Sequence, residues 1–104
     1  MSKFDLKDKV AIVTGGAGGI GAAIARAFSE AGAKVVVSSR NHANIDRVAA
    51  DLKASGGESL AIATDVTIPE QVDNMVKQTM DTFGRIDILV NNAGGAMVMG
   101  KPEE

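Results

Sequence analysis

A glycine-rich turn is the segment of this sequence best suited to chemistry. It runs from Thr14 to Gly21, between the apolar run Val10–Val13 and a segment with helical spacing. Glycine permits a tight turn with positive φ and close approach of the backbone to a bound group. A helix that begins there directs unpaired N–H groups and a partial positive charge toward an anion. No Lys-Ser or Lys-Thr pair follows, which excludes a P-loop. The turn therefore predicts a pyrophosphate site, and a glycine-rich connection that binds nothing is the alternative.

The turn fits two glycine patterns. Gly16, Gly18 and Gly21 spell G-x-G-x-x-G, whereas Gly15, Gly19 and Gly21 belong to T-G-x-x-x-G-x-G. The turn by itself does not choose between them.

Other reactive side chains are sparse. The 104 residues include no Cys, no Tyr and one His. Without cysteine there is no disulfide framework, thiolate nucleophile or Cys-based zinc site. The absence of cysteine is also compatible with a reducing compartment. His42 lacks a positioned partner in the sequence, so we expect a solvated loop residue near the end of the second strand rather than a catalytic group.

Charge and hydropathy exclude two classes of partner. Eleven Lys and Arg are interspersed with thirteen Asp and Glu, for a net charge of -2, so no basic field for nucleic acid is expected. No apolar run approaches the length of a membrane span. We therefore expect a cytoplasmic chain that contacts neither nucleic acid nor membrane.

Two alternating hydrophobic periods predict the elements that must position the turn. Four short apolar runs have the composition of strands buried on both faces: Val10–Val13, Val35–Val37, Leu60–Ala63 and Ile86–Val90. Between them, apolar positions follow helical spacing: Ile20, Ile24, Ala27, Phe28 and Ala31; Ile45, Val48, Ala49 and Leu52; Val72, Met75, Val76, Thr79, Met80 and Phe83. The order β-α-β-α-β-α-β predicts a single partial α/β domain over residues 1–104, a three-layer Rossmann-type parallel sheet. With strand order 3-2-1-4, a ligand crevice opens at the carboxyl ends of the strands.

Local signals refine this outline. Glycines that suit left-handed helix ends follow each helical pattern: Gly32, Gly56-Gly57 and Gly84. Thr67–Glu70 has the sequence of a capping box with proline in the first turn, and either Asn41 or Asn44 can cap the second helix. The fourth strand is expected to be an apolar edge, which natural proteins normally pair or cover. The chain therefore resembles the first half of a larger sheet.

Polar residues close three of the predicted strands. Thr14 ends the first, Asp65-Val66 the third and Asn91-Asn92-Ala93-Gly94 the fourth. Together with T-G-x-x-x-G-x-G, they resemble the short-chain dehydrogenase/reductase family from about Lys7 to Gly95. The resemblance implies a role for each matching residue: Gly15, Gly19 and Gly21 at the phosphates, Ile20 near the nicotinamide half, Asp65 and Val66 at the adenine edge, and Asn91, Ala93 and Gly94 at the nicotinamide ribose. On the residues alone, local bonding by Asp65 and a simple turn at Asn91-Asn92 remain open.

The end of the second strand bears on the choice of dinucleotide. NAD sites generally place a carboxylate there for the ribose hydroxyls, whereas NADP sites replace it with a cation for the 2′-phosphate. Here Ser39 and Arg40 end the strand, and no Asp or Glu occurs between Glu30 and Asp46. The turn lacks the additional basic residue of many NADP-dependent members, since Gly18 stands at that position. An exposed arginine with no ligand is the alternative, but one cation and no carboxylate favour NADP(H) over NAD(H).

The resemblance also implies chemistry that these residues do not provide. Members of the family use a tyrosine acid/base, a lysine four residues later, a serine and a later asparagine, and all four positions would lie beyond Glu104. We therefore assign no catalytic residue and no metal ligand to this chain. We expect the NADP(H)-binding half of an oxidoreductase that interconverts alcohols and carbonyl compounds. The alternative is a stand-alone nucleotide-binding or interaction module, which pairs its fourth-strand edge with a second copy or another chain.

Overall fold

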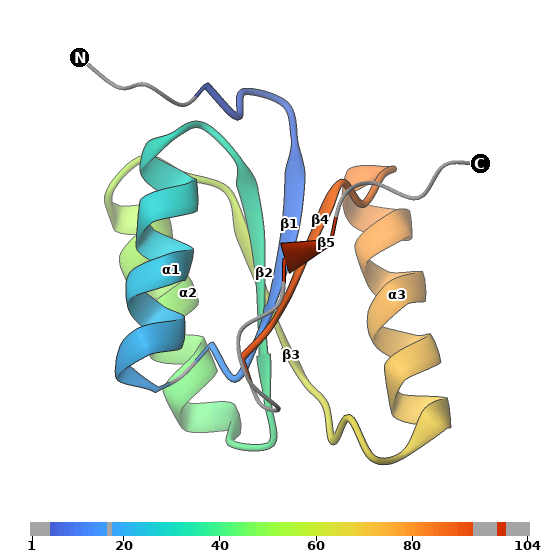
Figure 1. The fold of residues 1–104 in the computed structure, drawn as a ribbon. Helices are drawn as coiled ribbons and strands as arrows, with labels where there is room; N and C mark the ends of the chain where they lie inside the picture. Colours follow the sequence, from blue (N-terminus) through green and yellow to red (C-terminus); the bar gives the residue numbers. More distant parts are fainter. Residues whose placement is uncertain (1–4, 17, 93–97, 100–104) are drawn as a thin grey trace.

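The computed structural model describes residues 5–16, 18–92 and 98–99, and they form an α/β sandwich around one sheet. The elements follow each other as β1 (Val10–Thr14), α1 (Gly19–Glu30), β2 (Lys34–Ser39), α2 (His42–Ala54), β3 (Ser59–Ala63), α3 (Pro69–Phe83), β4 (Ile88–Asn91) and β5 (Val98–Met99). Figure 1 shows α1 and α2 on one face of the sheet and α3 on the other. The predicted three layers are confirmed.

The sheet has the order β3-β2-β1-β4-β5. β1 pairs in parallel with β2 on one side and with β4 on the other, and β2 pairs in parallel with β3. The predicted order 3-2-1-4 is therefore confirmed, and the carboxyl ends of β1 to β4 meet at the same edge. A parallel sheet of this kind must be covered on both faces, and the three helices cover it here.

The prediction that the fourth strand ends the sheet is wrong. β5 pairs antiparallel with β4, with Leu89 opposite Met99 and Val90 opposite Val98. The expected start of the fourth strand is also displaced, because Ile86 precedes β4 and the ladder begins at Ile88. A two-residue strand carries little periodic signal, so the sequence pattern did not indicate β5.

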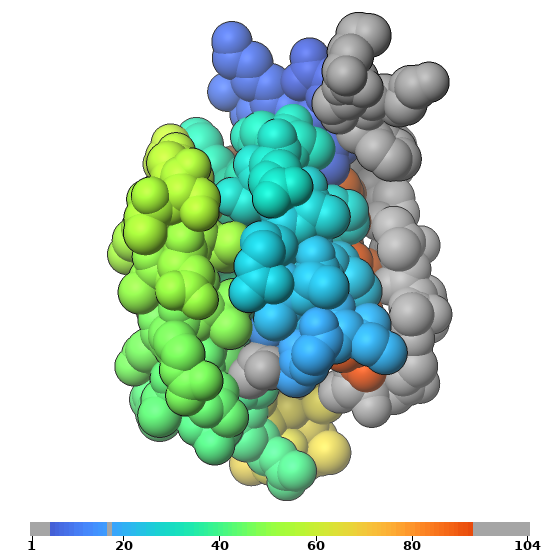
Figure 2. All heavy atoms as spheres, turned by 90° about the vertical axis from the view of Figure 1, so that its left-hand side faces the viewer, coloured from blue at the N-terminus to red at the C-terminus, as the bar shows by residue number. Residues whose placement is uncertain are grey.

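Alternation along the strands divides the core into two clusters. On the face of α1 and α2, Val13, Val35 and Val37 pack with buried side chains of α2 such as Ile45 and Leu52. On the opposite face, the cluster consists of Ile12, Val36, Ile62 and Met75. Figure 2 looks onto the first face and shows α2 and α1 side by side across it. Burying strands on both faces in this way holds their carboxyl ends in fixed register.

The helical stripes are partly as predicted. The four apolar residues of α2 are all buried. On α3, however, Val76 and Met80 are exposed, and on α1 Ile20 is 68% exposed, so these residues lie outside the core. The helical spacing was predicted correctly. However, the face that each of α1 and α3 buries against the sheet is narrower than its row of apolar residues.

The caps also differ in part from expectation. Gly32, Gly56 and Gly84 have positive φ, as predicted. Asn41 rather than Asn44 caps α2, because its side chain accepts a hydrogen bond from the Asn44 N–H at 3.1 Å. The capping box at Thr67 is wrong: Ile68 is the N-cap of α3, with no side-chain cap bond, and Pro69 begins the helix.

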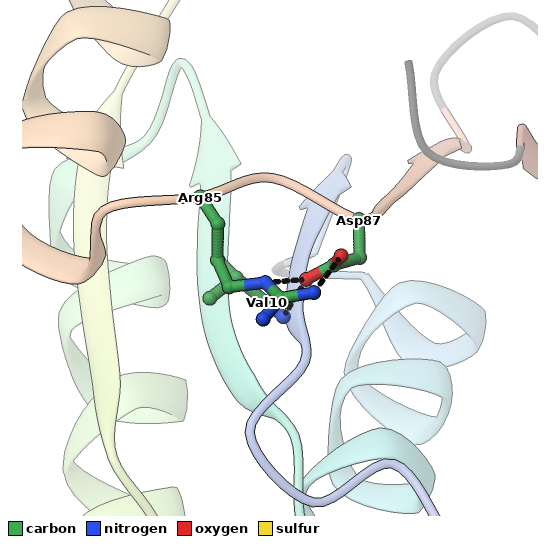
Figure 3. A network of polar contacts seen from close by, with 3 residues as sticks. All are labelled: Val10, Arg85 and Asp87. Carbon is green, nitrogen blue, oxygen red and sulfur yellow. Dashed lines mark hydrogen bonds and ion pairs between the residues drawn. The ribbon is translucent and has the colours of Figure 1, made fainter. Parts of the chain in front are cut away.

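A polar network fixes the amino ends of β1 and β4, opposite the predicted crevice. Asp87 is buried, and it accepts hydrogen bonds from the Val10 N–H and from the guanidinium of Arg85 (Figure 3). The Arg85 guanidinium lowers the pKa of Asp87, as does the Val10 N–H, although burial acts in the opposite direction. The carboxylate therefore remains ionised where it joins the two strands.

Candidate dinucleotide site

A cavity of about 390 Å³ opens at the carboxyl ends of the parallel strands. Its lining residues are Gly15, Ser38, Ser39, Arg40, Thr64, Asp65, Val66, Thr67 and Asn91. A neighbouring cavity of about 510 Å³ shares Arg40, Thr64 and Asp65 and extends to the first turns of α2 and α3. Both lie where the strand order predicts a ligand crevice.

The glycine turn brings the backbone of β1 against the start of α1. Gly15 has φ 68°, and the Gly18 N–H donates to its carbonyl oxygen at 3.4 Å. A Cβ on Gly21 would overlap that same carbonyl group, whereas a Cβ on Gly19 would meet no described residue within 4 Å. Gly18 is the N-cap, and no side chain among the described residues caps the helix. The first turn of α1 therefore presents main-chain N–H groups to the solvent side of the turn, as anion sites do.

Gly16 has a separate packing role. A Cβ there would come within 3.0 Å of the Val13 carbonyl oxygen and 3.2 Å of the Val37 side chain. Its N–H donates to the Ser38 carbonyl oxygen at 3.2 Å. Glycine at this position thus allows the turn to lie against β2, whichever of the two glycine patterns contacts a ligand.

The end of β2 places a cation beside the cavity. The Ser39 hydroxyl accepts from the Asn41 N–H at 3.1 Å and donates to the Asn41 carbonyl at 3.4 Å, so the loop closes on itself before α2 begins. Arg40 lies between these two residues, is exposed and lines both cavities. His42 lines the neighbouring cavity as the first residue of α2, so the expectation of a loop position was wrong.

The end of β3 holds an ordered carboxylate. Asp65 Oδ1 accepts from the Thr67 N–H at 2.9 Å and from the Thr67 hydroxyl at 2.6 Å. The Asp65 N–H donates to Gln71 Oε1 at 2.8 Å. The Thr67 hydrogen bonds lower the pKa of Asp65, and the charge of Arg40 adds to this effect. Asp65 is thus a charged acceptor at neutral pH.

The end of β4 is tied to the glycine turn. The Thr14 hydroxyl lies 3.2 Å from both the Val90 carbonyl oxygen and Asn91 Oδ1. The Asn92 N–H donates to the Thr14 carbonyl at 3.3 Å, and its side-chain amide donates to the Gly15 carbonyl at 3.4 Å. These bonds join the glycine turn to the loop after β4, although the two segments are distant in the sequence.

The structure brings most of the predicted site residues together. Six line the 390 Å³ cavity: Gly15, Ser39, Arg40, Asp65, Val66 and Asn91. Gly19, Ile20 and Gly21 form the first turn of α1 next to it. Ala93 and Gly94 lie outside the described residues.

Sequence reasoning missed three lining residues, Ser38, Thr64 and Thr67. Ser38 is fully buried, and its hydroxyl has no hydrogen-bond partner among the residues that the structure describes. A polar residue at the last buried position of a strand is a signal that could have found it. Thr67 was instead assigned to a helix cap, although a threonine two residues after Asp65 also fits a local turn.

Comparisons with known proteins agree with this geometry. The sequence profile described as short chain dehydrogenase matches residues 9–104. The chain belongs to the short-chain dehydrogenase family. An uncharacterized oxidoreductase of Mycobacterium tuberculosis is 44% identical over 93% of this chain and 37% of its own length. A 3-oxoacyl-[acyl-carrier-protein] reductase of Synechocystis is 46% identical over 86% of this chain and 36% of its own length.

Solved structures of the family show the same fold. A short-chain type dehydrogenase/reductase from Mycobacterium marinum superposes with a TM-score of 0.80 and 44% identity, over 84% of this chain and 34% of that one. This short-chain dehydrogenase chain therefore spans little more than a third of the length of these relatives. The family implies an NAD(P) cofactor and oxidoreductase chemistry for proteins of this kind.

Two further properties concern only the described part of the chain. No helix there is long and apolar enough to cross a membrane. No cluster of three or more His, Cys, Asp or Glu side chains there could hold a metal ion.

Proposed function

We propose that this chain is the NADP(H)-binding portion of an oxidoreductase that interconverts alcohols and carbonyl compounds. The observation that carries the proposal is the position of Arg40, which lines the cavity next to Ser39 with no carboxylate following β2. A guanidinium can pair with a phosphate through two parallel hydrogen bonds, and a ribose hydroxyl offers no comparable charge. The 2′-phosphate of NADP(H) would therefore be favoured over the hydroxyl of NAD(H).

The surrounding residues fit a dinucleotide. The uncapped start of α1 and the glycines at positions 15, 19 and 21 suit the pyrophosphate, and Ile20 is an exposed apolar side chain beside it. Asp65 and Val66 would hold the adenine edge, and Asn91, Ala93 and Gly94 would contact the nicotinamide ribose. When bound, the nicotinamide ring supplies hydride transfer. The residues of this chain bind and orient the dinucleotide, and no residue is proposed to move a proton.

Catalysis by the whole protein would need groups beyond those in this sequence. The sequence contains no tyrosine, and a tyrosine is the acid/base that the family resemblance implies. We therefore propose that binding, without turnover, is the activity of these 104 residues. The cytoplasm is the location we propose, and the absence of cysteine is compatible with its reducing conditions.

Calorimetric titration of the 104-residue chain with NADPH and with NADH tests the proposal. We expect NADPH to bind at least about tenfold more tightly, since one charge-assisted hydrogen bond contributes roughly 1.5–3 kcal/mol. Tighter binding of NADH would refute the NADP(H) assignment, and no heat with either nucleotide would refute the dinucleotide site. Turnover of a reactive carbonyl compound with NADPH would refute the assignment of binding without catalysis.

The alternative of an interaction module pairing through β4 has weaker support. β5 already occupies Leu89 and Val90, the central part of that edge. A concentration-dependent dimer in sedimentation experiments that left nucleotide binding unchanged would favour this alternative.

A further inference from the structure

The pairing of β5 with β4 points to a role for β5 that is separate from nucleotide binding. We propose that β5 is a releasable cap on the outer edge of β4, which keeps the chain monomeric, and that a second copy pairs its own β4 at this edge when the cap is released. The inference does not depend on the proposed function, because it concerns the edge of the sheet and requires no nucleotide.

The two sides of β4 are covered unequally. On its inner side β4 pairs with β1 over four residues, from Ile88 to Asn91, whereas β5 pairs with two residues on its outer side (Figure 1). The sequence of β4, Ile-Leu-Val-Asn, carries no charge. Proteins prevent edge-to-edge pairing of sheets with charged residues or with very short edge strands. Among the described residues, the short strand β5 is therefore what protects this edge.

The backbone groups that β5 covers follow from the hydrogen bonds on the inner side of β4. The Asn92 N–H donates to the carbonyl oxygen of Thr14, the last residue of β1. Backbone groups of successive residues point to opposite sides of a strand, so those of Leu89, three positions earlier, face β5. Met99 lies opposite Leu89, and the N–H of each faces the carbonyl of the other. The backbone groups of the neighbouring Val98 point away from β4.

A second copy of the chain fits the same edge. β5 runs antiparallel to β4, which shows that the edge accepts a strand of this direction. Two β4 strands related by a two-fold axis also run antiparallel, and each presents the same residues to the other. Such a pair can use all four residues of β4, whereas β5 uses two. Because β5 and a second β4 would need the same backbone groups, pairing between copies requires release of β5.

The connection between the two strands favours β5 over a second copy. Residues 92–97 join β4 to β5, so pairing of β5 is intramolecular. A short connection gives the tethered strand an effective concentration on the order of millimolar. A second copy at lower concentration cannot displace the intact cap, but it can take the place of a weakened one.

Two proline substitutions at adjacent positions test the cap. Met99→Pro removes the N–H that faces Leu89, whereas Val98→Pro removes an N–H that points away from β4, where proline is tolerated. Losing one backbone hydrogen bond shifts the pairing equilibrium by roughly two- to tenfold. In sedimentation velocity, we expect Met99→Pro to dimerise as its concentration rises. The unmodified chain and Val98→Pro should remain monomeric over the same range.

Hydrogen exchange at the Leu89 amide reports on the same edge. In the unmodified chain, its protection should not depend on protein concentration. In dilute Met99→Pro, exchange should be roughly two- to tenfold faster, and protection should return at high concentration as a second β4 pairs. The Ile12 amide is the internal reference and should exchange equally in both proteins, because Ile12 lies in β1 between β2 and β4.

Three results would overturn the inference: a Met99→Pro chain that stays monomeric, equal exchange at Leu89 in the two proline variants, or dimerisation of the unmodified chain. Val98→Gly combined with Met99→Gly weakens β5 without proline and should behave like Met99→Pro. Thermal unfolding of each variant shows that the comparison is made on folded protein. None of these measurements uses a nucleotide, so failure to bind NADPH would overturn the proposed function and not this inference.

Discussion

The carboxylate of Asp87 accepts a hydrogen bond from the Val10 N–H at 2.9 Å, although the two residues are 77 positions apart in the sequence. Arg85 donates to both oxygens of the same carboxylate, at 2.8 and 2.7 Å (Figure 3). Val10 is fully buried, so its N–H has no access to water. The contact therefore joins the start of β1 to the residue that precedes β4.

Asp87→Ala should lower the free energy of unfolding by about 1–3 kcal/mol, since it leaves a buried N–H without an acceptor. Urea denaturation at neutral pH measures the loss. Asp73→Asn, which changes an exposed carboxylate of α3, is the control and should stay within about 0.5 kcal/mol of the unmodified chain. A loss no larger than that of the control would contradict the role of Asp87.

The same carboxylate predicts an acid dependence. Arg85 and Val10 lower the folded-state pKa of Asp87 below its usual value of 3.8. Its stabilisation is therefore fully present above that value and is lost as the pH falls through the folded-state pKa. In denaturation series from pH 6 to about pH 2.5, Asp87→Asn should lose less stability than the unmodified chain. Parallel curves for the two proteins would argue against this linkage.

The glycine turn predicts opposite results at two glycines of α1. Gly21→Ala would place a Cβ on the Gly15 carbonyl group, so it should destabilise the chain by roughly 1–3 kcal/mol and weaken NADPH binding. The Cβ of Gly19→Ala meets nothing within 4 Å among the residues that the structure describes, so this variant should not be destabilised. Thermal unfolding and calorimetry measure both effects. Equal stability of the two variants would show that the close approach of Gly21 is not required.

Thr14 links the turn to the end of β4. Thr14→Val removes the hydroxyl that lies 3.2 Å from the Val90 carbonyl oxygen and from Asn91 Oδ1. We expect a loss of about 1 kcal/mol in the free energy of unfolding and a several-fold weaker affinity for NADPH. Thr14→Ser is the control, because it retains the hydroxyl. If Thr14→Val bound NADPH as tightly as Thr14→Ser, the bonds between the two loops would have no role in the site.

Arg40 decides the proposed choice of cofactor. Arg40→Asp should weaken NADPH binding by about tenfold or more and strengthen NADH binding, since a carboxylate repels the 2′-phosphate and accepts from the ribose hydroxyls. Arg26→Asp makes the same change of charge at an exposed position of α1 and serves as the control. Equal effects of the two substitutions would assign the result to net charge rather than to the site.

The periodicity of the sequence was sufficient to predict the layers, the strand order and the edge of the sheet that carries the site. Buried parallel strands must be apolar on both faces, and the glycines after Thr14 are distinctive because a tight turn into a helix requires them. Six of the cavity's lining positions were also expected: Gly15 from the glycine turn, Ser39 and Arg40 from the end of the second strand, and Asp65, Val66 and Asn91 from the resemblance to the family.

Only the tertiary structure decided which partners the polar groups take. Thr67 could cap α3 or bond to Asp65, and the path of the chain after β3 favours Asp65. Likewise, no pattern along the chain indicated that Asp87 would accept from the Val10 N–H or that β5 would pair with β4. Hydrophobic periodicity can be read from neighbouring residues along the chain. A hydrogen bond between distant segments depends instead on where the fold places its donor and its acceptor.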